Sequence, residues 1–222
     1  MQLYEIIISN PQLALILVPI LLFSLCLHEY AHARVAYHFK DQTAFRAGRV
    51  TLNPLAHLDP VGTLMLFIVG IGWAKPVPVD TSQLRPRKLG NIAVSLAGVT
   101  SNFLLIIACA LMLKLTIVFN SKIPPIYYNT MIRAFLIAIS INTVLTIFNI
   151  LPIYPLDGHH VVYELLPANQ KRDFMQFQRK YGLYILLGIL FLPRFLNMPN
   201  YLSILVNWVE NLVLSIFGLT AA

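Results

Sequence analysis

Two histidines and a glutamate with the spacing of a metal site lie at the end of a long apolar stretch. His28 and His32 are four residues apart, and Glu29 follows the first of them. On a helix, positions i and i+4 share a face with Cβ atoms about 5–6 Å apart, so both imidazoles can reach one zinc ion at about 2.0–2.1 Å. Glu29 lies roughly 100° further round the helix, where it can take a proton from an attacking water. This pattern predicts a hydrolytic zinc site.

The helix that must position these groups is expected over Leu13–Phe39. From Leu13 to Leu27 it is nearly all hydrocarbon, interrupted by Pro19, Ser24 and Cys26. The same three-residue pattern arises by chance in soluble chains. Within a membrane-spanning helix, however, ionisable side chains are costly and usually functional. The context therefore favours a metal site over coincidence.

The composition indicates a membrane protein with many spans. Of 222 residues, 58% are hydrophobic and 11% are charged, and the net charge is +7. Most basic residues lie in short loops beside apolar segments, as the positive-inside rule expects of cytoplasmic loops, so nucleic acid is not needed to explain the charge. The three basic groups are Arg34, Lys40, Arg46 and Arg49; Lys75, Arg85, Arg87 and Lys88; and Lys171, Arg172, Arg179 and Lys180.

The apolar segments predict an all-α polytopic fold with about five transmembrane helices. They are residues 13–39, 92–119, 131–151, 183–192 and 201–219. Residues 61–73 are too short to span, and they predict a re-entrant hairpin. The proline-rich residues 74–80 predict an extended, β-like edge near the cytoplasmic membrane surface.

The chain is expected to form one membrane-embedded domain, residues 1–222. Its core would be residues 13–166, and residues 181–219 would be accessory helices. Residues 1–10 contain no Lys or Arg, so we expect no cleaved signal peptide and a retained first helix.

A catalytic zinc site has three protein ligands and an open position, so a third ligand must come from elsewhere. The strongest candidate is Asp157, which follows the apolar segment 131–151. Pro152 and Pro155 prevent regular helix there, and Gly158 gives the backbone freedom to turn the carboxylate. Irregular backbone at membrane depth is tolerated where it is buried or lines a cavity.

Alternatives to this third ligand remain open. Asp157 could cap a helix that continues through Val161 to Leu166, either in place of binding metal or in addition to it. The rival ligands are His159, His160, Glu164 and His57.

Two amides lie in or at the edge of expected spans, Asn102 and Asn149. Either could hydrogen-bond to a neighbouring helix or hold a substrate's backbone. Gly98 and its small neighbours favour close helix packing.

Together these motifs resemble the site-2 protease family of intramembrane zinc metalloproteases, particularly its compact bacterial members. The resemblance covers roughly residues 20–165, and the order of the segments makes it specific. The segments that carry it are residues 28–32, 53–64, 72–79, Gly98 with Asn102, and 149–158. The chain departs from some relatives in two ways: we expect neither a PDZ domain between the later motifs nor a CBS pair after Leu219, and we expect no spanning helix before the first motif.

The resemblance implies one zinc ion per chain, held by His28, His32 and Asp157, with Glu29 as general base. It also implies that Asn102 and Asn149 hold substrate backbone or the oxyanion. The expected activity is hydrolysis of peptide bonds within or next to transmembrane segments of membrane protein substrates. The expected location is the bacterial inner membrane, with the active site towards the cytoplasm.

A zinc-binding membrane protein without protease activity, such as a transporter or a chaperone-like scaffold, is the alternative. A transporter should place ligands along a pathway, whereas these cluster at one site. A scaffold would be expected to lose Glu29, which is present.

Overall fold

The computed structural model describes residue 6 and residues 8–68 and 72–219; their regular secondary structure is helical, and they contain no β-strand. Three helices are long and apolar enough to cross a membrane: α2 (Pro11–His38), α5 (Arg87–Val118) and α6 (Pro125–Ile150). Their 28, 32 and 26 residues correspond to lengths of about 39–48 Å, which exceed a bilayer's hydrocarbon core of about 30 Å. The three expected central spans are therefore confirmed as long apolar helices.

Shorter helices and two C-terminal helices complete the chain. They are α3 (Thr43–Arg46), η1 (Pro54–Ala56), α4 (Pro60–Ile68), η2 (Asn120–Lys122), α7 (Gly158–Leu165), α8 (Ala168–Phe195) and α9 (Tyr201–Ile216). The expected fourth span, residues 183–192, lies inside α8, which also contains the basic residues that precede it. The expected fifth span, residues 201–219, corresponds to α9, which has 16 residues. The expected count of five spans is not confirmed, because three described helices meet the length and composition of a span.

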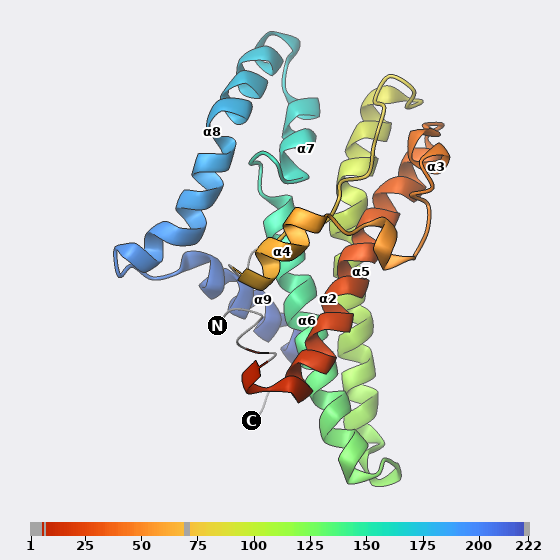
Figure 1. Ribbon diagram of the computed structural model, residues 1–222, viewed down its shortest axis with the longest axis vertical. Coiled ribbons are helices and arrows are strands. Elements are labelled where there is room, and N and C mark those ends of the chain that lie inside the picture. Colours follow the sequence, from red (N-terminus) through yellow and green to blue (C-terminus); the bar gives the residue numbers. More distant parts are fainter. Residues whose placement is uncertain (1–5, 7, 69–71, 220–222) are drawn as a thin grey trace.

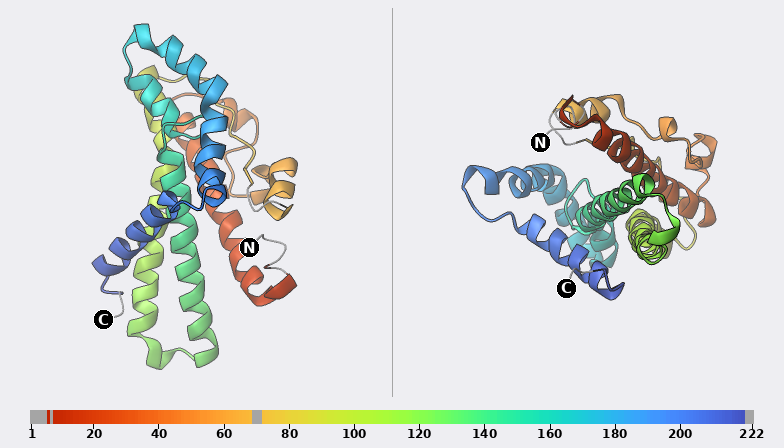
Figure 2. Two further views of the ribbon diagram at one scale, coloured as in Figure 1. Left: turned by 90° about the vertical axis from the view of Figure 1, so that its left-hand side faces the viewer. Right: turned by 90° about the horizontal axis from the view of Figure 1, so that it is seen from below.

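Helices α2, α5 and α6 pack side by side as a three-helix bundle (Figures 1 and 2). Small residues line the contact between α2 and α5, including Ala33, Ala36, Ala97 and Gly98, and they let the helix backbones approach closely. One apolar cluster, around Ile106, joins α5 and α6 to α9. A second, around Ala36, Leu84 and Val94, lies near the other end of the bundle.

Residues 58–68 and 72–74 lie beside α2, and an antiparallel bridge between Leu58 and Ala74 joins these two described arms. The arms meet at two glycines, since a Cβ on Gly72 would collide with the backbone oxygen of Gly62. Residues 74–80 are extended, as expected, but the isolated bridge does not make them a strand. The hairpin's tip lies outside the described residues, and its re-entry into the membrane stays a prediction.

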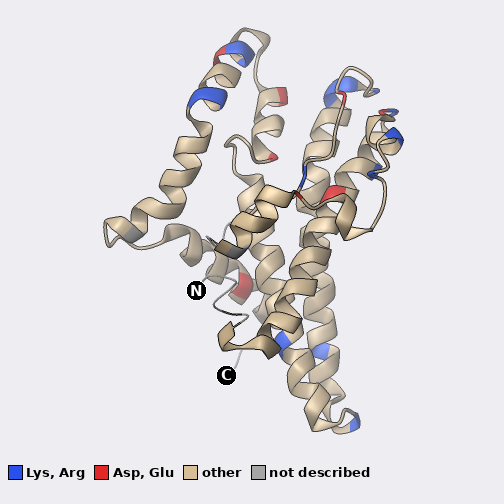
Figure 3. Cartoon of the chain, viewed as in Figure 1, with Lys and Arg blue, Asp and Glu red and all other residues tan. Residues whose placement is uncertain are grey.

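Basic side chains gather at one end of the bundle. Lys and Arg are concentrated around α3, the start of α5 and the start of α8, and few lie near the turn between α5 and α6 (Figure 3). This uneven distribution of basic side chains in the structure agrees with the clustering of Lys and Arg in the loops that the sequence predicts to be cytoplasmic.

Candidate metal centre

Three possible metal ligands converge where α2 crosses the start of α7. The Nε2 atoms of His28 and His32 lie 3.1 Å apart. Each lies 3.2 Å from Oδ2 of Asp157. Among the described residues, these three form the one cluster of His, Cys, Asp or Glu able to hold a metal ion.

The spacing of these atoms fits a zinc ion. Two ligand atoms bonded to one tetrahedral zinc at about 2.0–2.1 Å lie about 3.3 Å apart. Apart from the two histidine nitrogens, the buried Oδ2 of Asp157 has no partner in the described part of the chain. A buried carboxylate oxygen facing two imidazoles is a donor set that zinc satisfies, and the fourth position is left for water or substrate.

The capping interpretation of Asp157 is wrong. Asp157 occupies the N-cap position of α7, but its side chain makes no capping hydrogen bond. The carboxylate points instead to the histidines of α2. The break after α6 makes this possible, because Leu151 is extended and Pro152 follows it.

Glu164 fixes α7, and with it Asp157, against the neighbouring helices. Its carboxylate accepts from Asn91 of α5 at 2.6 Å and from Lys171 of α8 at 3.0 Å. Burial raises the pKa of this carboxyl, but the hydrogen bonds from Asn91 and Lys171 hold the pKa below its ordinary value. Glu164 is therefore an anchor and lies outside the metal cluster.

The other rival ligands also lie outside the metal cluster. His57 is buried and bonded to the Thr51 carbonyl, and His159 is bonded to the Leu156 carbonyl. His160 is exposed. Asp157 alone of the candidates lies beside both α2 histidines.

The far nitrogens of both α2 histidines are held by α5. A zinc-bound imidazole that coordinates through Nε2 carries its proton on Nδ1 and donates it to a nearby acceptor. His32 has such an acceptor, the Val94 carbonyl at 2.7 Å. His28 Nδ1 lies 3.2 Å from the amide of the fully buried Asn102. A half-turn of that amide brings its otherwise unpartnered oxygen to Nδ1 as the acceptor.

Asn102 thus lies behind a candidate ligand, where the sequence suggested a contact with substrate. Asn149 is half-buried at the end of α6 and donates to the Leu145 carbonyl of its own helix at 3.0 Å. No described hydrogen bond joins Asn149 to the metal cluster.

Gly98 is part of the site, in addition to the helix packing that its sequence context favoured. A Cβ at this position would lie 2.5 Å from Nε2 of both His28 and His32. Glycine is therefore needed for α5 to pass behind the histidine pair. The sequence signal for this role is the four-residue spacing between Gly98 and Asn102, which places both residues on the face of α5 that meets α2.

Glu29 lies beside the cluster and outside it. Its Oε2 accepts a hydrogen bond of 3.1 Å from the Val77 amide of the extended segment. Buried Arg49 donates to the Pro76 carbonyl at 3.3 Å and also to the Lys75 carbonyl, which fixes this segment next to Glu29.

We expect Gly98→Ala to lose most of its bound zinc. The added methyl would occupy the space of the histidine nitrogens, so the ligands or α5 must shift. The measurement is zinc content per purified chain. Gly188→Ala is the matched control, because a Cβ there meets no atom within 4 Å. Full zinc content in Gly98→Ala would contradict this geometry.

Comparisons with known proteins show the family of the chain. Residues 16–193 match the model of Peptidase family M50. The chain is 37% identical over 177 residues to "Putative zinc metalloprotease YwhC" of Bacillus subtilis, covering 80% of each chain. It is 31% identical over 178 residues to "Putative zinc metalloprotease Rip2" of Mycolicibacterium smegmatis, covering 78% of this chain and 65% of that protein.

A Rip2 protein of Mycobacterium tuberculosis is 32% identical over 182 residues. No solved structure matches. Because the family match extends over most of the chain and includes every residue of the metal cluster, the chain belongs to peptidase family M50, the site-2 protease family.

Proposed function

We propose that this protein is an intramembrane zinc metalloprotease in which His28, His32 and Asp157 hold one zinc ion and Glu29 is the general base. The observation that carries the proposal is the convergence of three ligand atoms at 3.1–3.2 Å, with Glu29 next to the first ligand and outside the cluster. Membership of family M50 and the names of the relatives support it.

The chain's own residues supply positioning and proton transfer. Zinc bound at the cluster supplies a Lewis acid for the scissile carbonyl and lowers the pKa of water towards about 7. Glu29 accepts the proton of the attacking water at a carboxylate oxygen and delivers it to the leaving amine. The Val77 amide holds the Glu29 carboxylate in place by donating a hydrogen bond to Oε2. Asn102 and the Val94 carbonyl orient the two imidazoles.

The proposed substrates are transmembrane segments of other proteins. A helical substrate hides each carbonyl in its own hydrogen bond, so it must unwind before hydrolysis, and the freed groups need new partners in lipid. The extended segment 74–80 offers edge pairing beside Glu29, and Asn149 offers an amide at the end of α6.

A zinc transporter or a chaperone-like scaffold explains fewer of these observations. In the described residues the candidate ligands form a single cluster, whereas a transporter should place metal ligands along a pathway through the membrane. Neither alternative needs a proton acceptor beside the metal.

We expect Glu29→Gln to abolish cleavage while zinc binding is kept. Glutamine is nearly isosteric but cannot accept the proton, and general base catalysis contributes about 10²–10⁴-fold. The assay compares wild type and variant on a panel of single-span substrates, with zinc content measured in parallel. Glu210→Gln makes the same change in α9 and should cleave normally. Unchanged cleavage by zinc-loaded Glu29→Gln would refute the mechanism, and no cleavage by wild type would favour the alternative.

Alanine at His28, His32 or Asp157 should leave markedly less than one zinc per chain. Each change removes one of three ligands, whereas His159→Ala and His160→Ala remove side chains outside the cluster and should keep the metal. Metal analysis of the purified variants checks this. If Asp157→Ala kept its zinc while His160→Ala lost it, the third ligand would be wrongly assigned.

We also propose that the basic end of the bundle, which includes residues 40–60, 74–90 and 167–180, faces the cytoplasm. In a cysteine-free background, Arg46→Cys should then be protected from a membrane-impermeant thiol reagent in intact cells, and Tyr127→Cys should react. Both positions are exposed, and they lie towards opposite ends of the bundle. Labelling of both from the same side would exclude this topology.

A further inference from the structure

The segment between α6 and α7, residues 151–157, carries Asp157 and has few ways of holding itself in place. Pro152 and Pro155 have no N–H to donate, and the segment's hydrogen bonds to itself are short turns. Asp157 makes no capping hydrogen bond to α7. The direction of its carboxylate therefore depends on what holds residues 151–157 from outside.

Gln178 of α8 bonds to this segment at two points. Its Oε1 accepts from the Tyr154 N–H at 2.9 Å, and its Nε2 donates to the Pro152 carbonyl at 2.7 Å. An amide turned the other way would face a donor with a donor and an acceptor with an acceptor, so the two backbone partners determine its orientation. Gln178 is 5% exposed. One buried side chain thus pairs with both a donor and an acceptor shortly before Asp157.

α8 meets this segment along one face. Gln178 and Gly182 are four residues apart, which places them one above the other on the helix. A Cβ at Gly182 would lie 2.9 Å from both the Cβ and the backbone oxygen of Tyr154, so glycine is needed for this approach. Of the α8 residues whose burial the structure describes, only Gln178 and Gly182 are buried. This face of α8 is therefore fitted to the segment that carries Asp157.

The same face of α8 also holds the chain after Asp157. Lys171 precedes Gln178 by seven residues, or about two helical turns, and it donates to Glu164 of α7 at 3.0 Å. The attachments at Tyr154 and Glu164 lie three residues before Asp157 and seven residues after it. Figures 1 and 2 show α8 outside the three-helix bundle, on the side of α7. α8 thus holds the segment of the third candidate ligand at both ends.

Resting on the proposed function, we propose that Gln178 is a positioning residue, which holds residues 151–157 so that the Asp157 carboxylate faces the two histidines of α2. A segment released from Gln178 would spend part of its time with Asp157 turned elsewhere. The apparent zinc affinity falls in proportion to the fraction of chains that keep the binding arrangement. The metal centre then requires α8, which lies beyond the expected core of residues 13–166.

The test is the zinc affinity of Gln178→Met, measured by competition with a chelator. Methionine has a similar length and helix propensity but can make neither hydrogen bond of the amide. We expect the affinity to fall about tenfold, which corresponds to about 1.4 kcal/mol. The visible absorption spectrum of the cobalt-substituted protein, which reports ligand number and geometry, should change as well. Gln176→Met is the matched control, because Gln176 is exposed on the same helix, and it should match the wild type in both measurements.

A double-mutant cycle separates positioning from a general loss of structure. In Asp157→Ala, zinc can bind only to the two histidines, so a residue that acts through Asp157 has no further effect there. We expect Gln178→Met to leave the residual zinc affinity of Asp157→Ala unchanged. An equal loss of affinity in both backgrounds would overturn the proposal.

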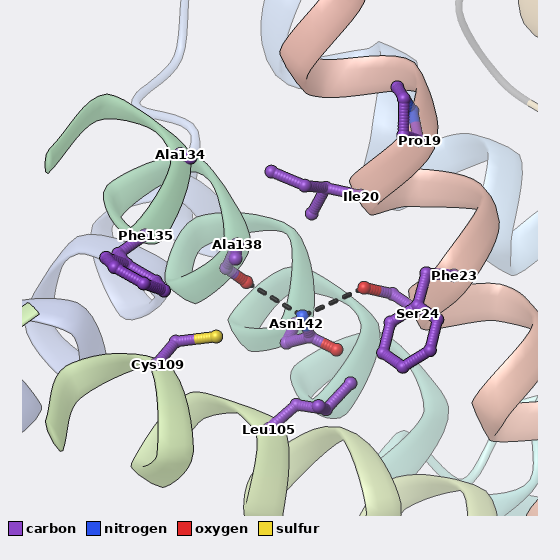
Figure 4. A pocket seen from close by; sticks show the side chains of 10 residues that line it. All are labelled: Pro19, Ile20, Phe23, Ser24, Leu105, Cys109, Ala134, Phe135, Ala138 and Asn142. Carbon is purple, nitrogen blue, oxygen red and sulfur yellow. Dashed lines mark hydrogen bonds between the residues drawn. The ribbon is translucent and has the colours of Figure 1, made fainter. Parts of the chain in front are cut away.

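A second control removes a buried amide from another part of the bundle. Asn142 of α6 is 1% exposed and donates to the Ala138 carbonyl at 2.8 Å and to the Ser24 hydroxyl at 2.9 Å. It lines an apolar cavity between α2, α5 and α6 (Figure 4). Its hydrogen-bond partners belong to α2 and α6, so Asn142→Leu should keep the zinc affinity of the wild type. A loss as large as that of Gln178→Met would make general packing the cause and overturn the proposal.

Gly182→Ala tests the same contact without changing Gln178. The added methyl group would collide with Tyr154, so α8 or the segment must shift. We expect a loss of zinc affinity that disappears in the Asp157→Ala background, and none in Gly188→Ala, where a Cβ meets no atom within 4 Å. Wild-type affinity in both Gly182→Ala and Gln178→Met would refute the positioning role. A wild type that binds no zinc would instead overturn the proposed metal site, and this inference with it.

Discussion

The close approach of α2 and α5 at Gly98 is the contact on which the rest of the site depends. Glycine leaves room for two imidazoles between the helix backbones, and a methyl group there would fill it. With the helices this close, Val94 and Asn102 of α5 reach the far nitrogens of His32 and His28. Close packing by small residues therefore determines ligand orientation as well as helix association.

The third candidate ligand depends on an interruption of helical structure. Proline residues after α6 end the helix, and the chain turns so that Asp157 faces α2 from the start of α7. Glu164 then ties α7 to Asn91 and Lys171. A site assembled from three segments can hold buried charge because the Asp157 carboxylate faces both imidazoles and the Glu164 carboxylate is paired with Asn91 and Lys171.

Polar side chains follow one line through the bundle. The pair His28 and Asn102 lies at one level, and the pair Ser24 and Asn142 lies one turn further along α2. Such pairs also act as hydrogen-bonded contacts between membrane helices.

The sequence alone predicted the metal-binding spacing of His28, Glu29 and His32, the three long apolar segments, and the helix breaks at Pro152 and Pro155. It could do so because helical periodicity, hydropathy and proline chemistry are local properties of the chain. Choosing Asp157 over His57, His159 and Glu164 as a ligand needed the packing of α7 against α5, which places Asp157 beside the α2 histidines, since every one of these residues is chemically capable. The roles of Gly98 and Asn102 likewise rest on which face of α5 meets α2. The expected count of five spans is not confirmed, because neither α8 nor α9 combines the length and the apolar composition of a span. Distances between atoms far apart in the sequence are properties of the folded bundle, and they decide which of several suitable side chains form the site.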